Sequence, residues 1–186
     1  DTSDSGQYAR IYQDAAAQAA GSTSTTWSQG GGVQTSPTYA GISQVSYSTN
    51  WVYIRTTGLA GYVMGPWSNV PSFPANNARI YRFPRTPAIP TSKTLTALGP
   101  VGQMVNGVSI FDSRDGFSYV NASSTDATPQ NRLRGDGVWN RDAWSNEGRV
   151  FDPAGAHQAG PHYHNHVNPL ALRHQLGDHV DYVAAT

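Results

Sequence analysis

The sequence predicts an all-β or β-dominated α+β fold, in which one domain of short antiparallel strands forms a sandwich or barrel-like body behind an N-terminal helix or arm. Charged residues make up 13% of the 186 residues, about half the usual share, which disfavours long surface helices. Ser, Thr, Gly, Asn, Pro and aromatic residues take their place and suit short strands joined by turns. From residue 42 onward, short apolar runs alternate with turn residues.

The first 38 residues are expected to form a unit of their own. Helical spacing of apolar residues predicts a helix over 4–21, with Asp4 or Ser5 as its cap and Gly21 at its end. Residues 22–38 (STSTTWSQGGGVQTSPT) are a connector rich in Ser, Thr and Gly. The sequence therefore divides into an N-terminal helix or arm with its connector, 1–38, and a β domain, 39–186.

Within the β domain, the run ISQVSYSTNWVYIRTTG alternates around residues 48–50 and predicts a hairpin. The runs GYVMGPW, ARIYRFPR, GQMVNGVSIFD and GFSYVN are expected to be further short strands. Residues 120–148 are rich in Asn, Asp and Gly and are expected to be mainly loop, with Trp139 and Trp144 as packing anchors. The segment ALRHQLGDH predicts a short helix that Gly177 ends.

Composition and charge exclude several classes of function. The formal net charge is +0 and the isoelectric point is about 7.2, so no basic surface for nucleic acid is indicated. No apolar run approaches the roughly 18 residues that a membrane span requires. The absence of cysteine excludes disulfides and thiolate ligands. Low charge and a start at Asp1, without methionine, favour a processed protein that is secreted or lies at the cell surface.

The histidines are the strongest functional signal. All six lie in the last thirty residues, and the stretch GPHYHNHVNP places three of them at alternate positions. In a strand these three side chains would share one face. Imidazole is the commonest metal ligand, and nitrogen ligands without sulfur suit Cu(II) or Zn(II). We therefore predict a copper or zinc site from this group: His157, His162, His164, His166 and His179. The alternative is a polar strand whose histidines bond to backbone or water.

Other polar groups have simpler explanations. The loops FDSRDG and RGDGVWNRD carry four aspartates that could hold calcium, but they lack regular calcium-loop spacing, and turn chemistry explains them better. These aspartates are Asp112, Asp115, Asp136 and Asp142. The single glutamate, Glu147, could act as a base or a ligand, yet capping or pairing with Arg141 or Arg149 is the favoured expectation.

Several segments resemble the YHYH-domain proteins, which are named for a Tyr-His-Tyr-His strand followed by proline. The match is Tyr163-His164-Asn165-His166 with Pro169 beyond it, and similar segments extend it over roughly residues 42–182. Asn165 replaces the second tyrosine, and His162 adds a third histidine. The family's usual C-terminal continuation does not occur within these 186 residues, as expected for a short variant, a processed form or part of a longer polypeptide. The resemblance implies a secreted or surface-associated protein and supplies no substrate class.

Three functions remain open at this point. The first is a secreted metal-binding protein, and the second is a self-assembling extracellular subunit of filament or surface-layer type, which would be a homo-oligomer. The third is a metal-dependent oxidase or hydrolase, although no GxSxG motif or other strong catalytic constellation supports it. Two aromatic pairs could stack on sugars, but roles as core anchors are preferred for Trp51, Tyr53, Trp139 and Trp144.

Overall fold

The computed structural model describes residues 40–67, 72–114, 118–127, 135–136 and 139–183. It also gives the backbone of two short strands that pair antiparallel, β1 (Ser28–Gln29) and β2 (Gly32–Val33). The helix expected over 4–21 lies outside the described residues, as does most of the connector. Strands dominate the described part over helices, which confirms the predicted fold class.

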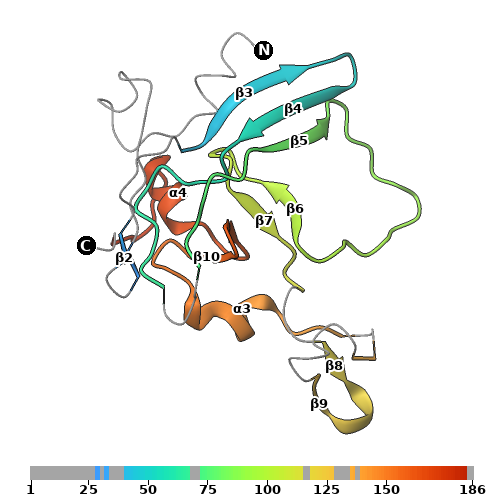
Figure 1. The fold of residues 1–186 in the computed structure, drawn as a ribbon. Coiled ribbons are helices and arrows are strands. Elements are labelled where there is room, and N and C mark those ends of the chain that lie inside the picture. Colours follow the sequence, from blue (N-terminus) through green and yellow to red (C-terminus); the bar gives the residue numbers. More distant parts are fainter. Residues whose placement is uncertain are drawn as a thin grey trace.

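The first half of the β domain forms a three-stranded antiparallel sheet in the order β3–β4–β5 (Figure 1). The predicted hairpin is confirmed, because β3 and β4 flank a turn in which the Ser48 amide donates to the Trp51 carbonyl over 2.8 Å. Each strand is six residues long, so its side chains alternate between two faces. The bounds are Ile42–Tyr47 for β3, Trp51–Thr56 for β4 and Arg79–Pro84 for β5.

A second sheet carries the histidine-rich segment, in the strand order β10–β11–β7–β6. Two of its pairings are antiparallel, whereas β11 and β7 run parallel. A parallel pair needs a long connection. Here the connection between β7 and β11 contains the short strands and helices described in the next paragraph. The bounds are Pro100–Gln103 for β6, Ser109–Phe111 for β7, Ala156–Ala159 for β10 and His162–Asn165 for β11.

Residues 120–148, expected mainly as loop, also contain regular structure. The strands β8 (Tyr119–Val120) and β9 (Thr125–Asp126) form a small ribbon around the 3-10 helix η1 (Asn121–Ser123), away from the main sheets in Figure 1. Two elements follow it, α3 (Ala143–Glu147) and η3 (Gly148–Val150). Trp139 and Trp144 are 63% and 56% exposed. Neither indole is therefore a core residue, although the Trp144 ring packs against Phe151.

The main core gathers side chains from segments far apart in the sequence. The run GYVMGPW forms none of the strands, but it contributes Tyr62, Met64 and Trp67 to this core. Tyr163 of β11 packs edge-on against Tyr62 and Trp67. The helix α4 (Leu170–Gln175) adds Leu172 and ends just before Gly177, at φ +80°, as predicted. The core thus holds β11 firmly from the face opposite His164.

Among the described residues, no helix is both long and apolar enough to cross a membrane. This agrees with the sequence, which has no apolar run of spanning length.

Candidate metal centre

The β10–β11 hairpin brings the first two histidines together. Register places His157 of β10 directly opposite His164 of β11, and side chains at directly opposed positions share one face of a sheet. Gly160, at φ +59°, lies in the connection between the two strands. His166 follows the end of β11, so a single hairpin and its extension supply all three imidazoles.

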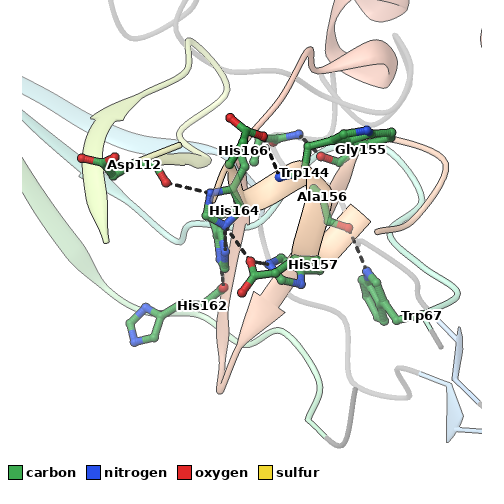
Figure 2. A network of polar contacts seen from close by, with 12 residues as sticks. Trp67, Asp112, Trp144, Gly155, Ala156, His157, His162, His164 and His166 are labelled. Carbon is green, nitrogen blue, oxygen red and sulfur yellow. Dashed lines mark hydrogen bonds and ion pairs between the residues drawn. The ribbon is translucent and has the colours of Figure 1, made fainter. Parts of the chain in front are cut away.

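The three imidazoles converge, as Figure 2 shows. One ring nitrogen from each of His157, His164 and His166 lies within 4.8 Å of the others. The Nε2 atoms of His164 and His166 are 3.1 Å apart. His157 is 7% and His164 1% exposed, and the side chain of His166 is 1% exposed. The cluster is therefore shielded from bulk water.

Backbone partners fix the orientation of two of these rings. Nδ1 of His164 lies 2.8 Å from the carbonyl oxygen of His162, and Nδ1 of His166 lies 3.1 Å from that of Asp112. A carbonyl only accepts, so each Nδ1 carries the proton and each neutral ring presents a lone pair at Nε2. Two such lone pairs at 3.1 Å repel unless a proton or a cation lies between them. Histidines that bind metals are oriented by carbonyl partners of this kind.

The third ring has a buried atom without a hydrogen bond. Nε2 of His157 is buried and has no hydrogen-bond partner, although Oε2 of Glu147 lies 3.3 Å away. The carboxylate is thus within ion-pair distance but outside hydrogen-bond geometry. A buried, unsatisfied nitrogen is costly, and a bound cation at the centre of the cluster would satisfy it.

Aromatic rings enclose the cluster on two sides. Phe111 stacks on His164, with centroids 3.7 Å apart and planes 14° apart. Phe151 lies 4.8 Å from the His157 ring and 6.0 Å from the His166 ring. Burial, followed by the charge of His157, lowers the pKa of His164 to about 3. His164 therefore stays neutral at ordinary pH, which is the form that binds a metal.

Glu147, at the end of α3, approaches the same nitrogens. Its Oε2 lies 3.2 Å from Nε2 of His166 and 3.3 Å from Nε2 of His157. Burial raises the pKa of Glu147, but the two histidines outweigh burial and hold it below the usual value. Of the roles expected for Glu147, namely capping or pairing with Arg141 or Arg149, the pairing with Arg141 is not found, because Arg141 pairs with Asp126 at 2.7 Å. Sequence offered one hint of this role, since Glu147 is the only glutamate in the chain.

Two of the five predicted ligands lie elsewhere. His162 shares the β11 strand, but its ring lies apart from the cluster in Figure 2 and contacts Arg79, with Nδ1 2.7 Å from the guanidinium. His179 is exposed and lies beyond α4. The structure thus brings together His157, His164 and His166.

Three of the four aspartates in the suggested calcium loops serve turn and capping functions. Asp112 accepts from the Arg114 amide at 2.8 Å, and Asp136 accepts from the Asn121 amide. Asp142 caps α3 through the Trp144 amide at 2.9 Å. Asp115 lies outside the described residues. These contacts are the turn chemistry that the sequence favours over calcium binding.

A cavity of about 600 Å³ lies beside the cluster, and Phe151 belongs to both. Trp144, Val167 and Leu170 give this cavity a largely apolar lining. None of the three clustered histidines lines it.

Fold and site together define a β-rich domain with a buried three-histidine cluster. The chain matches the family model of the YHYH proteins over residues 80–183, and it belongs to that family. The match leaves out residues 42–79, where the segment resemblance began. Asn165, which departs from the family's name motif, is fully buried and donates to the Gly155 carbonyl at 3.0 Å. No protein with curated annotation and no solved structure matches the chain.

Proposed function

We propose that this protein binds one transition-metal ion through the Nε2 atoms of His157, His164 and His166. The observation that carries the proposal is the facing pair of lone pairs on His164 and His166, each fixed by an Nδ1–H bond to a backbone carbonyl. The unpartnered Nε2 of His157 adds a third donor. A cation at their common centre would relieve both the repulsion and the unsatisfied nitrogen.

The donor type selects the class of metal. Imidazole nitrogens suit zinc, copper and nickel, whereas calcium and magnesium prefer oxygen ligands. Copper or zinc is therefore the proposed ion. The low charge and the high content of Ser, Thr, Asn and aromatic residues support the further proposal that the protein works outside the cytoplasm or at the cell surface.

The test is metal uptake by chelator-treated protein, measured by calorimetry with Zn(II) and Cu(II). The wild-type protein should bind one equivalent, and a His164→Ala/His166→Ala variant should bind none at the same site. His162→Ala/His179→Ala is the matched control, because it also removes two predicted ligands but leaves the cluster intact, so it should bind like wild type. Absence of uptake by the wild-type protein would end the proposal.

A second candidate, self-assembly, is supported by the β3–β4–β5 sheet. Its outer strand β5 pairs on one side only among the described residues, and Ile80 on it is 57% exposed. Long unprotected edges favour pairing between chains. Sedimentation of the full chain over a wide concentration range tests this. A species that remains monomeric at the highest concentration would count against assembly.

A further inference from the structure

We infer that Glu147 is the fourth ligand of this site, which makes it a closed, tetrahedral zinc site that fastens α3 to the β10–β11 hairpin. This inference rests on the proposed metal-binding function. To the proposed function, the inference adds the complete ligand set, the preferred metal and a structural rather than a catalytic role for the ion.

The two contacts that Glu147 makes with the histidine nitrogens have nearly tetrahedral spacing. In a tetrahedral site with bonds of 2.0–2.1 Å, neighbouring ligand atoms are about 3.3–3.4 Å apart. In a square-planar copper site with similar bonds, adjacent ligand atoms would be about 2.8–3.0 Å apart. The contacts here are 3.1 Å for His164–His166, 3.2 Å for His166–Glu147 and 3.3 Å for His157–Glu147. The two contacts of Glu147 are closer to the tetrahedral spacing, the His164–His166 contact lies between the two values, and the three histidine nitrogens lie within 4.8 Å of one another.

Glu147 reaches this position because α3 is anchored through its first turn. Asp142 caps its start, and the Ala143 amide donates to the Ser113 carbonyl at 2.7 Å. The ring of Trp144, the second residue of α3, packs against Phe151, which itself lies on His157 and His166. The helix therefore delivers its last residue to the open side of the histidine cluster.

A complete set of four protein ligands has a functional consequence. Catalytic zinc sites keep a position for water or substrate, whereas structural sites are closed. A helix of five residues is far too short to persist without tertiary contacts. We therefore infer that the ion holds α3 against the hairpin, and the oxidase or hydrolase alternative is disfavoured.

The experiment compares wild-type protein with Glu147→Gln, which keeps the side chain's size and removes its charge. Asp126→Asn is the matched control, since it neutralises a carboxylate on the β8–β9 ribbon that pairs with Arg141. Chelator-treated proteins are titrated with Co(II), whose visible bands are intense in tetrahedral sites and weak at higher coordination numbers. Zn(II) affinity is then measured by competition, and hydrogen exchange follows the amides of 143–147.

The wild type and Asp126→Asn should show intense cobalt bands, and Zn(II) should slow exchange in 143–147. Glu147→Gln should shift the cobalt bands, because water or a neutral amide replaces the carboxylate, lose the protection of 143–147, and bind Zn(II) at least about tenfold more weakly, because even loss of an outer-shell partner has such an effect. Equal affinity and an unchanged cobalt spectrum in Glu147→Gln would overturn the fourth ligand while leaving the three-histidine site standing. A wild type that takes up neither ion would overturn the site itself.

Discussion

Asp152 bonds to Tyr163, the β11 neighbour of His164, and shows how burial controls a single carboxyl group. It is buried and accepts from the Tyr163 hydroxyl at 2.7 Å and from the Gly65 amide at 3.0 Å. Burial raises its pKa to about 6 despite these donors. The folded state therefore holds a proton that the unfolded chain releases nearer pH 4, so this group's contribution to stability falls as the pH rises from 4 to 6.

We expect Asp152→Asn to remove this pH dependence. Between pH 4 and pH 6.5 the wild type should lose about 2–3 kcal/mol of unfolding free energy that the variant does not lose. His164 acts in the opposite direction, since its lowered pKa costs stability as the pH falls. His164 is the same in the wild type and in Asp152→Asn. The difference between their pH profiles of unfolding free energy therefore isolates the contribution of Asp152. Urea unfolding in the presence of chelator measures it, with the exposed Asp178→Asn as control; parallel pH profiles would contradict the assignment.

At the scale of elements, the two sheets meet where Thr56 ends β4 and Gly107 turns the chain from β6 into β7. The Thr56 hydroxyl lies 3.1 Å from the carbonyl oxygens of both Gly41 and Gly107, and it accepts from the Gly58 amide at 2.9 Å. Gly107 has φ +87°, and a Cβ there would overlap the Thr56 hydroxyl. Position 107 therefore requires glycine for two reasons: its φ is positive, and a side chain there would overlap Thr56.

Two Gly→Ala substitutions distinguish the stability cost of backbone strain from the added cost of steric overlap. Gly177 ends α4 at φ +80° with open space around it, so Gly177→Ala should cost only the backbone strain, about 1 kcal/mol. Gly107→Ala has the same strain and also displaces Thr56, so it should cost more than about 3 kcal/mol. Thermal and urea unfolding of both variants test this ranking. Equal destabilisation would show that the sheet junction tolerates a methyl group.

Across the whole molecule, a net charge of zero conceals a separation of charge. Residues 15–111 contain five basic residues and no Asp or Glu. Three of the arginines lie on strands of the first sheet, namely Arg55, Arg79 and Arg82, and Arg85 follows β5 directly. Arg82 lies over the Trp51 ring at 4.1 Å. A surface of one sign gives a local field that net charge does not report.

We therefore expect the protein to be retained on a cation exchanger near its isoelectric point at low salt. Arg55→Gln should elute at clearly lower salt, because it weakens the basic sheet. Arg141→Gln changes the net charge by the same amount, but Arg141 is already paired with Asp126, so it should elute close to wild type. Equal shifts in the two variants would show that only net charge matters.

Much of the fold can be predicted from the sequence because local chemistry decides it. The hairpin of β3 and β4 follows from alternation around a polar turn, and the end of α4 follows from Gly177. The run GYVMGPW was expected as a strand and is instead irregular core. Its apolar residues determine burial, but apolar character alone does not distinguish a buried strand from buried coil.

The sequence alone shows that all six histidines lie in one segment and that no cysteine is present to supply a thiolate ligand. It also placed His164 and His166 on one motif. Only the tertiary structure selected His157 over His162 and His179, because cross-strand register puts His157 opposite His164 while Arg79 engages His162. It alone brought Glu147 to the cluster. Which donor atoms meet depends on strand pairing and helix packing between distant residues, and a linear pattern does not contain those contacts.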